Sequence, residues 1–188
     1  MKNLLVVIDM QNDFITGPLG NKECKSIVPN VINKINEASQ NGCEIVFTLD
    51  THGKNYLSTQ EGKKLPVEHC IENTDGWKLV PEIENELSKV ISLEKEEDNI
   101  YDNYTCFKKN TFGCTELGDF VACGNYDSVT LVGVCTDICV ISNALLIKAF
   151  STETEIVIDA SCCAGVTLES HKTALEAMKT CQITVIGE

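Results

Sequence analysis

The chain has 188 residues, a length typical of one domain that can bury a sizeable core. Its 15 basic and 28 acidic side chains give a formal net charge of -13 at pH 7. Because such a charge repels phosphate backbones and anionic lipids, we expect neither a nucleic acid nor a membrane as a partner. The apolar run before Asp9 is too short for a signal peptide, and no run of about 18 apolar residues occurs elsewhere. We therefore expect a cytoplasmic protein.

Segments rich in valine, isoleucine and leucine alternate along the chain with amphipathic segments. The apolar segments predict strands at residues 4–9, 43–50, 90–94, 128–134, 155–161 and 183–187, with a weaker strand signal at 104–108. The amphipathic segments predict helices at residues 28–41, 81–88, 115–122, 138–150 and 167–180. Between the second strand and the second helix, residues 51–76 form a long irregular stretch.

Most of the strand-like runs are continuously apolar, which is typical of parallel strands that are covered on both faces. We therefore predict a doubly wound α/β fold, with a mostly parallel six-stranded sheet and helices on both faces. The sequence contains no repeat, linker or low-complexity tract, which predicts one domain over residues 1–188. In such a fold a ligand binds at the carboxyl ends of the strands.

The 11 cysteines are an odd number, and no C-x-x-C motif occurs among them. This pattern disfavours a zinc ribbon and a thioredoxin-type redox motif. Because nothing marks the chain as secreted, we expect reduced thiols. Most of them should be buried and inert, as at Cys43, Cys123 and Cys181.

Polar side chains follow the carboxyl ends of several predicted strands, and a parallel sheet brings these ends to one edge. They are Asp9, Asp50, His52, Lys109 and the segment 135–139. Taken alone, Asp9 could cap the following turn and Lys109 would be a solvated surface lysine. Taken together, they supply a general base and a cation beside a thiol, which is what a cysteine nucleophile requires.

The segment LVGVCTDICV, residues 131–140, begins as a buried strand and ends as the first turn of a helix. Its two thiols could form a metal or redox pair, or one of them could be a nucleophile. Thr136 or Asp137 can cap the helix, which places Cys139 near the first turn. There the free N–H groups and the helix dipole favour a thiolate. Cys135, at the strand end, is expected to pack or to lend its backbone.

Two of the three histidines fall in the irregular stretch after the second strand. One carboxylate and two imidazoles, from Asp50, His52 and His69, form a set of ligands suited to zinc, iron or manganese. Each histidine alone is more often a surface or capping residue. His171 lies in the last amphipathic helix and is expected to be structural.

Five motifs in order resemble those of the isochorismatase-like cysteine hydrolases, and within that superfamily most of all the nicotinamidases and related amidases. They are VVIDMQNDF, FTLDTH, LPVEHCIENTDGW, KNTFG and GVCTDICV, and they span nearly the whole chain. The resemblance implies hydrolysis of a small carboxamide to the acid and ammonia, with nicotinamide as the foremost substrate. It also implies a homo-oligomer.

The resemblance assigns roles to individual residues. It implies a catalytic triad of Asp9, Lys109 and Cys139. A cis peptide bond between Val134 and Cys135 is implied as well, with the N–H groups of Cys135 and Cys139 directed at the developing oxyanion. A divalent metal, usually zinc, would be held by the ligand set Asp50, His52 and His69.

The sequence also departs from the nicotinamidase pattern. Thr51 and the Leu65–Pro66 region stand where nicotinamidases commonly carry tryptophan, and the segment after Lys109 is shorter. Two alternatives therefore remain: a cysteine hydrolase of another small amide, such as a carbamoyl or ureido compound, and an inactive binding protein. Isochorismatases proper lack the nucleophilic cysteine, so Cys139 argues against vinyl-ether hydrolysis.

Overall fold

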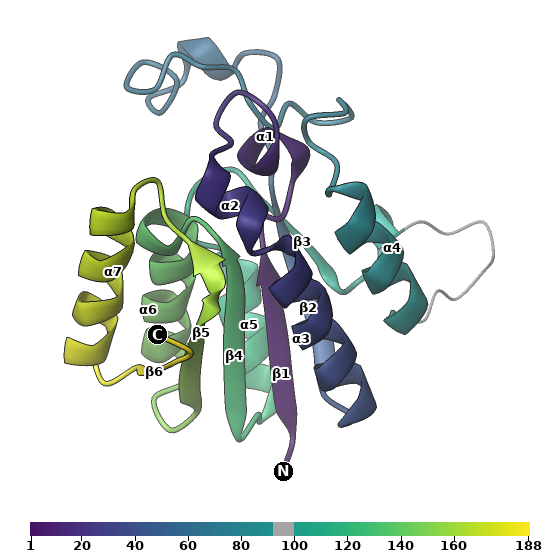
Figure 1. The fold of residues 1–188 in the computed structure, drawn as a ribbon, viewed down its shortest axis with the longest axis vertical. Helices are drawn as coiled ribbons and strands as arrows, with labels where there is room; N and C mark the ends of the chain where they lie inside the picture. The colour runs from purple at the N-terminus through teal and green to yellow at the C-terminus, as the bar shows by residue number, and fades with distance from the viewer. Residues whose placement is uncertain (92–99) are drawn as a thin grey trace.

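The computed structural model describes residues 1–91 and 100–188, and its centre is a parallel sheet (Figure 1). Within the described residues the sheet has six strands in the order β3-β2-β1-β4-β5-β6, and each neighbouring pair is parallel. The strands are β1 (Asn3–Ile8), β2 (Glu44–Asp50), β3 (Cys106–Lys109), β4 (Ser128–Val134), β5 (Glu155–Ala164) and β6 (Thr184–Ile186). The predicted doubly wound fold is confirmed.

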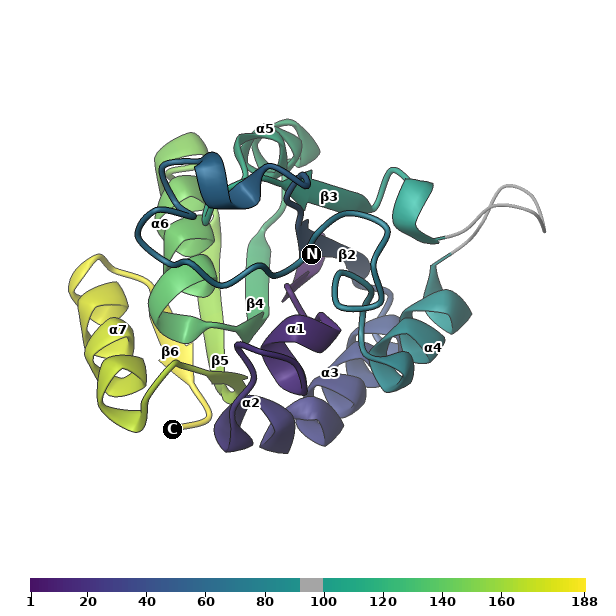
Figure 2. The ribbon, with the colours of Figure 1, turned by 90° about the horizontal axis from the view of Figure 1, so that it is seen from above.

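Helices cover both faces of this sheet, as Figure 2 shows for α3 and α4 on one side and α5 and α6 on the other. Their bounds are α1 (Asn12–Ile15), α2 (Lys22–Ser26), α3 (Val28–Gln40), α4 (Pro81–Val90), α5 (Thr115–Gly124), α6 (Ile141–Phe150) and α7 (Leu168–Thr180). Short 3₁₀ turns occupy Tyr56–Ser58 and Ile100–Asp102. No helix within the described part of the chain is long and apolar enough to cross a membrane.

Strand β1 explains why the apolar runs are continuous, because its side chains enter two cores alternately. Leu5 and Val7 pack with residues of α3 and α4, whereas Val6 and Ile8 pack with residues of α5, α6 and α7. A strand that is buried on both faces therefore needs an apolar residue at every position. The chain reverses its strand order between β1 and β4, and at this point a doubly wound sheet opens a crevice for ligands.

Gly133 lets the carboxyl end of β4 approach β1 closely. Its φ is +117, and a Cβ atom at this position would overlap the carbonyl oxygen of Ile8. The β4–β5 pairing also shifts register between Leu131 and Gly133. The backbone that leads into the segment 135–139 thus requires glycine here.

Several sequence-based expectations were wrong in detail. The strand predicted at 90–94 is not formed where the structure describes it, because Val90 ends α4 and Ile91 is outside any strand; residues 92–94 lie outside the described residues. Helices α1 and α2 were not expected, since each is only about one turn long. All 11 cysteines are free, but Cys123 and Cys181 are exposed and Cys43 is only half-buried.

Candidate active site

Three strand ends bring Asp9, Lys109 and Cys139 together at the carboxyl edge of the sheet. Lys109 Nζ lies 2.7 Å from Asp9 Oδ2 and 3.5 Å from Cys139 Sγ. All three side chains are buried, with relative exposures of 0% for Asp9, 4% for Lys109 and 6% for Cys139. We call these three residues the thiol half of the site.

Asp9 follows β1 in a left-handed backbone conformation, with φ of 48. Thr48 on the neighbouring strand donates its hydroxyl to Asp9 Oδ1 at 2.6 Å, which orients the carboxylate. The other oxygen, Oδ2, forms an ion pair with the ammonium of Lys109. Burial, assisted by the nearby charge of Asp50, raises the pKa of Asp9 against the opposing effect of Lys109. The carboxylate is therefore a stronger base than an exposed one.

Lys109 is the last residue of β3 and joins the thiol half to Asp50, whose Oδ1 lies 3.4 Å from Nζ. Burial opposes the charged ammonium, but the charges of Asp9, Cys139 and Asp50 outweigh it and raise the pKa of Lys109 well above its usual value. The ammonium stays charged at neutral pH. A fixed positive charge beside the sulfur can stabilise a thiolate or an oxyanion as it forms.

Cys139 lies in a π-helical turn, Thr136–Val140, that precedes α6. Burial raises the pKa of its thiol well above the usual value, although Lys109 opposes this change. Desolvation therefore opposes the thiolate that a helix start favours. A protonated thiol beside a basic carboxylate can still lose its proton during attack.

The expected cap of this helix was also wrong. Cys135 is the N-cap residue, and no side chain caps the turn. Thr136 instead forms a hydrogen bond of 2.8 Å with Nδ1 of His171, and Asp137 accepts the N–H of Val166 at 3.1 Å. The polar side chains of the turn therefore attach it to α7 and the loop before it, which leaves the turn's own N–H groups without a side-chain cap.

The peptide bond between Val134 and Cys135 is cis. The carbonyl of Cys135 accepts the N–H groups of Ile138 and Val140, both at 3.0 Å. Its side chain packs in the core with Cys24. The two thiols of the segment therefore have different surroundings, and only Cys139 faces Lys109.

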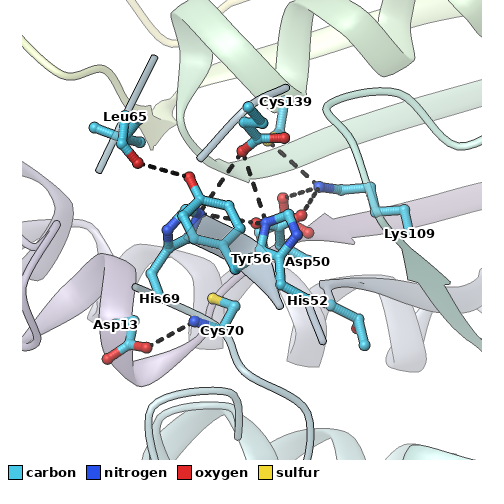
Figure 3. A network of polar contacts seen from close by, with 12 residues as sticks. Asp13, Asp50, His52, Tyr56, Leu65, His69, Cys70, Lys109 and Cys139 are labelled. Atoms are coloured by element: carbon cyan, nitrogen blue, oxygen red, sulfur yellow. Dashed lines mark hydrogen bonds and ion pairs between the residues drawn. The ribbon is translucent and has the colours of Figure 1, made fainter. Parts of the chain in front are cut away.

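Asp50, His52 and His69 form a second cluster beside the first, which we call the metal half. One donor atom from each residue lies within 4.8 Å of the donor atoms of the other two. Asp50 Oδ2 is 3.0 Å from His52 Nε2 and 3.4 Å from His69 Nε2 (Figure 3). Burial opposes ionisation of Asp50, but Lys109 and the two imidazoles outweigh it and lower the pKa of this carboxyl.

The donor set fits a divalent metal ion such as zinc. Nδ1 of His69 lies 2.8 Å from the carbonyl oxygen of Val67, a contact that orients the ring and leaves Nε2 toward Asp50. The sequence could not show whether His69 lies near Asp50 and His52, because the path of the chain between His52 and His69 was unknown. In the structure the irregular stretch folds back and brings His69 beside His52, with ring centroids 4.9 Å apart.

Two residues near the metal half were missed by sequence reasoning. Glu61 Oε1 lies 3.7 Å from His52 Nε2 and 3.9 Å from His69 Nε2, so it could provide a further oxygen ligand. Tyr56 is fully buried against both imidazoles, and its hydroxyl donates to the carbonyl of Leu65 at 3.0 Å (Figure 3). No spacing signal could have found either residue, because both lie in the irregular stretch.

The fold and this site define a doubly wound α/β protein whose sheet edge carries a buried thiol, an ammonium and a cluster of metal-type ligands. Comparison with known proteins gives the same class. The chain matches the family model of the Isochorismatase domain over residues 3–187. The protein belongs to the isochorismatase family.

Individual relatives are similar at modest identity. The chain is 27% identical to the nicotinamidase of Saccharomyces cerevisiae over 188 residues, which cover 82% of this chain and 85% of the yeast protein. It is 32% identical to a probable inactive nicotinamidase of Arabidopsis thaliana over 149 residues, 72% of this chain and 67% of that protein. The crystal structure of the pyrazinamidase of Pyrococcus horikoshii in complex with zinc has a TM-score of 0.77 and 26% identity, with 100% of both chains covered.

Proposed function

We propose that the protein is a metal-assisted cysteine amidohydrolase that converts a small carboxamide, foremost nicotinamide, to its acid and ammonia. The observation that carries this proposal is the position of Lys109 Nζ, 2.7 Å from the Asp9 carboxylate and 3.5 Å from the Cys139 sulfur. Base, cation and nucleophile are thus within reach of one another in a buried site. The nicotinamidase and pyrazinamidase relatives support amide hydrolysis.

In the proposed reaction Asp9 accepts the thiol proton while the sulfur of Cys139 attacks the carbonyl carbon of the amide. Lys109 stabilises the negative charge that develops, and the backbone N–H groups of Cys135 and Cys139 donate to the oxyanion. The proton returns from Asp9 to the leaving nitrogen, and ammonia departs. Water then hydrolyses the thioester, with Asp9 again as the base.

Asp50, His52 and His69 would hold the metal ion, which when bound supplies a Lewis acid that can bind a ring nitrogen of the substrate. Zinc is the first candidate, since a pyrazinamidase relative was solved with zinc. The chain itself orients these ligands: Val67 contacts the ring of His69 through its carbonyl oxygen, and Tyr56 packs against both imidazoles. A substrate held here lies beside the thiol half, because Lys109 contacts both Asp9 and Asp50.

One observation favours a second candidate, a hydrolase of a carbamoyl or ureido compound. Thr51 stands at a position where nicotinamidases commonly carry tryptophan, and the indole Nε1 of Trp77 donates to its hydroxyl at 2.9 Å. Trp77 is buried. The aromatic wall expected for a pyridine ring is therefore not supplied from position 51, and a non-aromatic amide is the natural competitor.

The third candidate, an inactive binding protein, has a relative of its own in the probable inactive nicotinamidase of Arabidopsis thaliana. Against it stands the retention in this chain of every side chain that the proposed reaction uses.

We also propose that residues 1–188 act as one domain in a cytoplasmic homo-oligomer. Light scattering of the purified protein measures the oligomeric state directly.

The experiment that separates these candidates is ammonia release by the metal-loaded protein from a panel of amides. Nicotinamide and pyrazinamide represent the first candidate, and N-carbamoyl amino acids and ureido acids the second. Turnover of nicotinamide is expected. Turnover of only the carbamoyl or ureido compounds would replace the nicotinamidase proposal, and inertness toward the whole panel would favour the binding protein.

A further inference from the structure

Gln11 lies just beyond β1 and is fully buried, with 0% exposure. Its side-chain amide uses all of its hydrogen-bonding groups. Nε2 donates to the carbonyl oxygens of Asp50 at 2.8 Å and Trp77 at 2.7 Å, and Oε1 accepts the N–H of Asp50 at 2.8 Å. A flipped amide would place its NH₂ group against the N–H of Asp50, so only one orientation satisfies these partners.

Asp50 is therefore held on both sides of its Cα atom by one side chain. The direct pairing of β1 with β2 extends to Val7 and Phe47. Beyond that point Gln11 links the two chain segments, in addition to the contact between Asp9 and Thr48. The hydrogen bond from Gln11 Nε2 to the carbonyl oxygen of Trp77 also connects Gln11 to the loop that follows His69. Gln11 thus joins the two segments that carry the ligands of the metal half.

Asn143 has the same role in the thiol half, one helical turn after Cys139. It is also fully buried, with 0% exposure. Its Nδ2 donates to the carbonyl oxygens of Cys139 at 2.8 Å and Phe112 at 3.0 Å, and its Oδ1 accepts the N–H of Cys114 at 2.9 Å. The amide therefore binds the turn that carries the thiol to the segment that follows Lys109.

We propose that Gln11 and Asn143 are positioning residues that act on separate halves of the site, Gln11 on the metal half and Asn143 on the thiol half. The inference rests on the proposed function, because that function assigns metal binding to Asp50 and nucleophilic attack to Cys139. Each amide touches backbone of its own half, and no hydrogen bond joins either amide to the other half within the described residues.

The test uses the near-isosteric substitutions Gln11→Met and Asn143→Leu, each of which is the matched control of the other. Both remove one side-chain amide that bonds three backbone groups, so a merely structural effect would be similar in the two variants. Two measurements are made on each variant. Zinc affinity is measured by competition with a chromogenic chelator, and the rate of Cys139 alkylation by iodoacetamide is measured by peptide mass spectrometry on metal-free protein.

We expect Gln11→Met to weaken zinc binding by about 10- to 100-fold, as for other residues that orient metal ligands. Its Cys139 alkylation rate should stay within about twofold of the parent protein. Asn143→Leu should slow alkylation of Cys139 by about tenfold, because the sulfur loses its place beside Lys109, while its zinc affinity stays within about twofold. With an amide substrate, the first variant should raise KM and the second should lower kcat.

Equal changes of both measurements in both variants, or no change in either, would overturn the positioning roles. If either variant fails to fold in a thermal melt, Gln11→Glu and Asn143→Thr, which keep one polar partner, replace it with the same expected pattern. The crossed pattern in a protein that hydrolyses no amide supports the positioning roles and rejects the proposed function. If the parent protein hydrolyses nicotinamide but the two variants do not show this pattern, the proposed function stands and the positioning roles are rejected.

Discussion

The two halves of the site are built from different kinds of structure. In the thiol half, Asp9 and Lys109 lie at or directly beyond the ends of β1 and β3, and Cys139 lies in the first turn after β4. In the metal half only Asp50 lies on a strand. His52 and His69 belong to the long irregular stretch, in which Glu61 and Tyr56 also lie.

This difference separates what the sheet determines from what side-chain contacts determine. The edge of a parallel sheet brings the residues of the thiol half close together, because the strand order brings these strand ends together. The metal half exists only because the loop folds back, held by the contacts of Tyr56 and by the hydrogen bond that the N–H of Cys70 donates to Asp13 Oδ2 at 2.8 Å. Changes to one half should therefore leave the other half largely intact.

The largest effect is expected from Cys139→Ala, which removes the nucleophile. Amide turnover should fall by at least about 10,000-fold, as when other nucleophiles of this kind are removed. Zinc affinity should not change, because the sulfur contacts no ligand of the metal half. Cys135→Ala is the matched control and should retain most activity, since its side chain packs with Cys24. The reverse result for the two cysteines would show that the nucleophile was assigned wrongly.

Asp9→Asn should have the next largest effect. The amide cannot accept the thiol proton, so kcat should fall by about 100- to 10,000-fold. Steady-state kinetics measure this loss, and chelator competition should show an unchanged zinc affinity. A variant that keeps more than a tenth or so of parental kcat would mean that another group takes the proton.

A change in the metal half tests whether the thiol half keeps its reactivity when the metal is lost. His69→Ala should release the metal or weaken its binding by about 10- to 100-fold, with KM for nicotinamide raised accordingly. Alkylation of Cys139 by iodoacetamide should proceed at nearly the parental rate, because Asp9 and Lys109 remain. If the variant keeps its metal and full turnover, His69 is not a ligand, and the proposed ligand set of the metal half is wrong.

The smallest expected effect concerns the pH dependence of the thiol in the metal-free protein. Because burial raises the pKa of Cys139 and only its thiolate reacts, alkylation should accelerate with rising pH and reach its midpoint above the ordinary thiol value of 9.0. The unfolded protein provides the reference. A midpoint below the reference would mean that the helix start and Lys109 outweigh burial, as the sequence had suggested.

The sequence predicted most of the sheet, because a continuous apolar run as short as β1, β2, β4 or β5 fits a buried strand better than a helix. It did not predict α1 and α2, which lack the length for a helical period. The segment 90–94 was interpreted as a strand from its apolar residues, but Val90 ends α4 and packs there, partly buried, against the core. The local sequence pattern could not show whether that residue would pack as part of a strand or as part of the helix before it.

For the site, sequence order was enough to propose Asp9, Lys109 and Cys139, because strand ends share an edge. It could not reveal Glu61, a charged residue among others in an irregular stretch. The raised pKa of Cys139 was not predicted either. Its position at a helix start is visible in the sequence, whereas the desolvation that opposes a thiolate depends on packing that no local pattern shows.

The most direct test of the proposed reaction is capture of its covalent intermediate. Metal-loaded protein is mixed with nicotinamide, quenched in acid within the first turnovers and digested, and the peptides are examined by mass spectrometry. We predict a nicotinoyl thioester on the peptide that contains Cys139, and none on the peptide from a Cys139→Ala variant treated in the same way. Ammonia release without an acyl group on Cys139, or with the acyl group on another residue, would contradict the account.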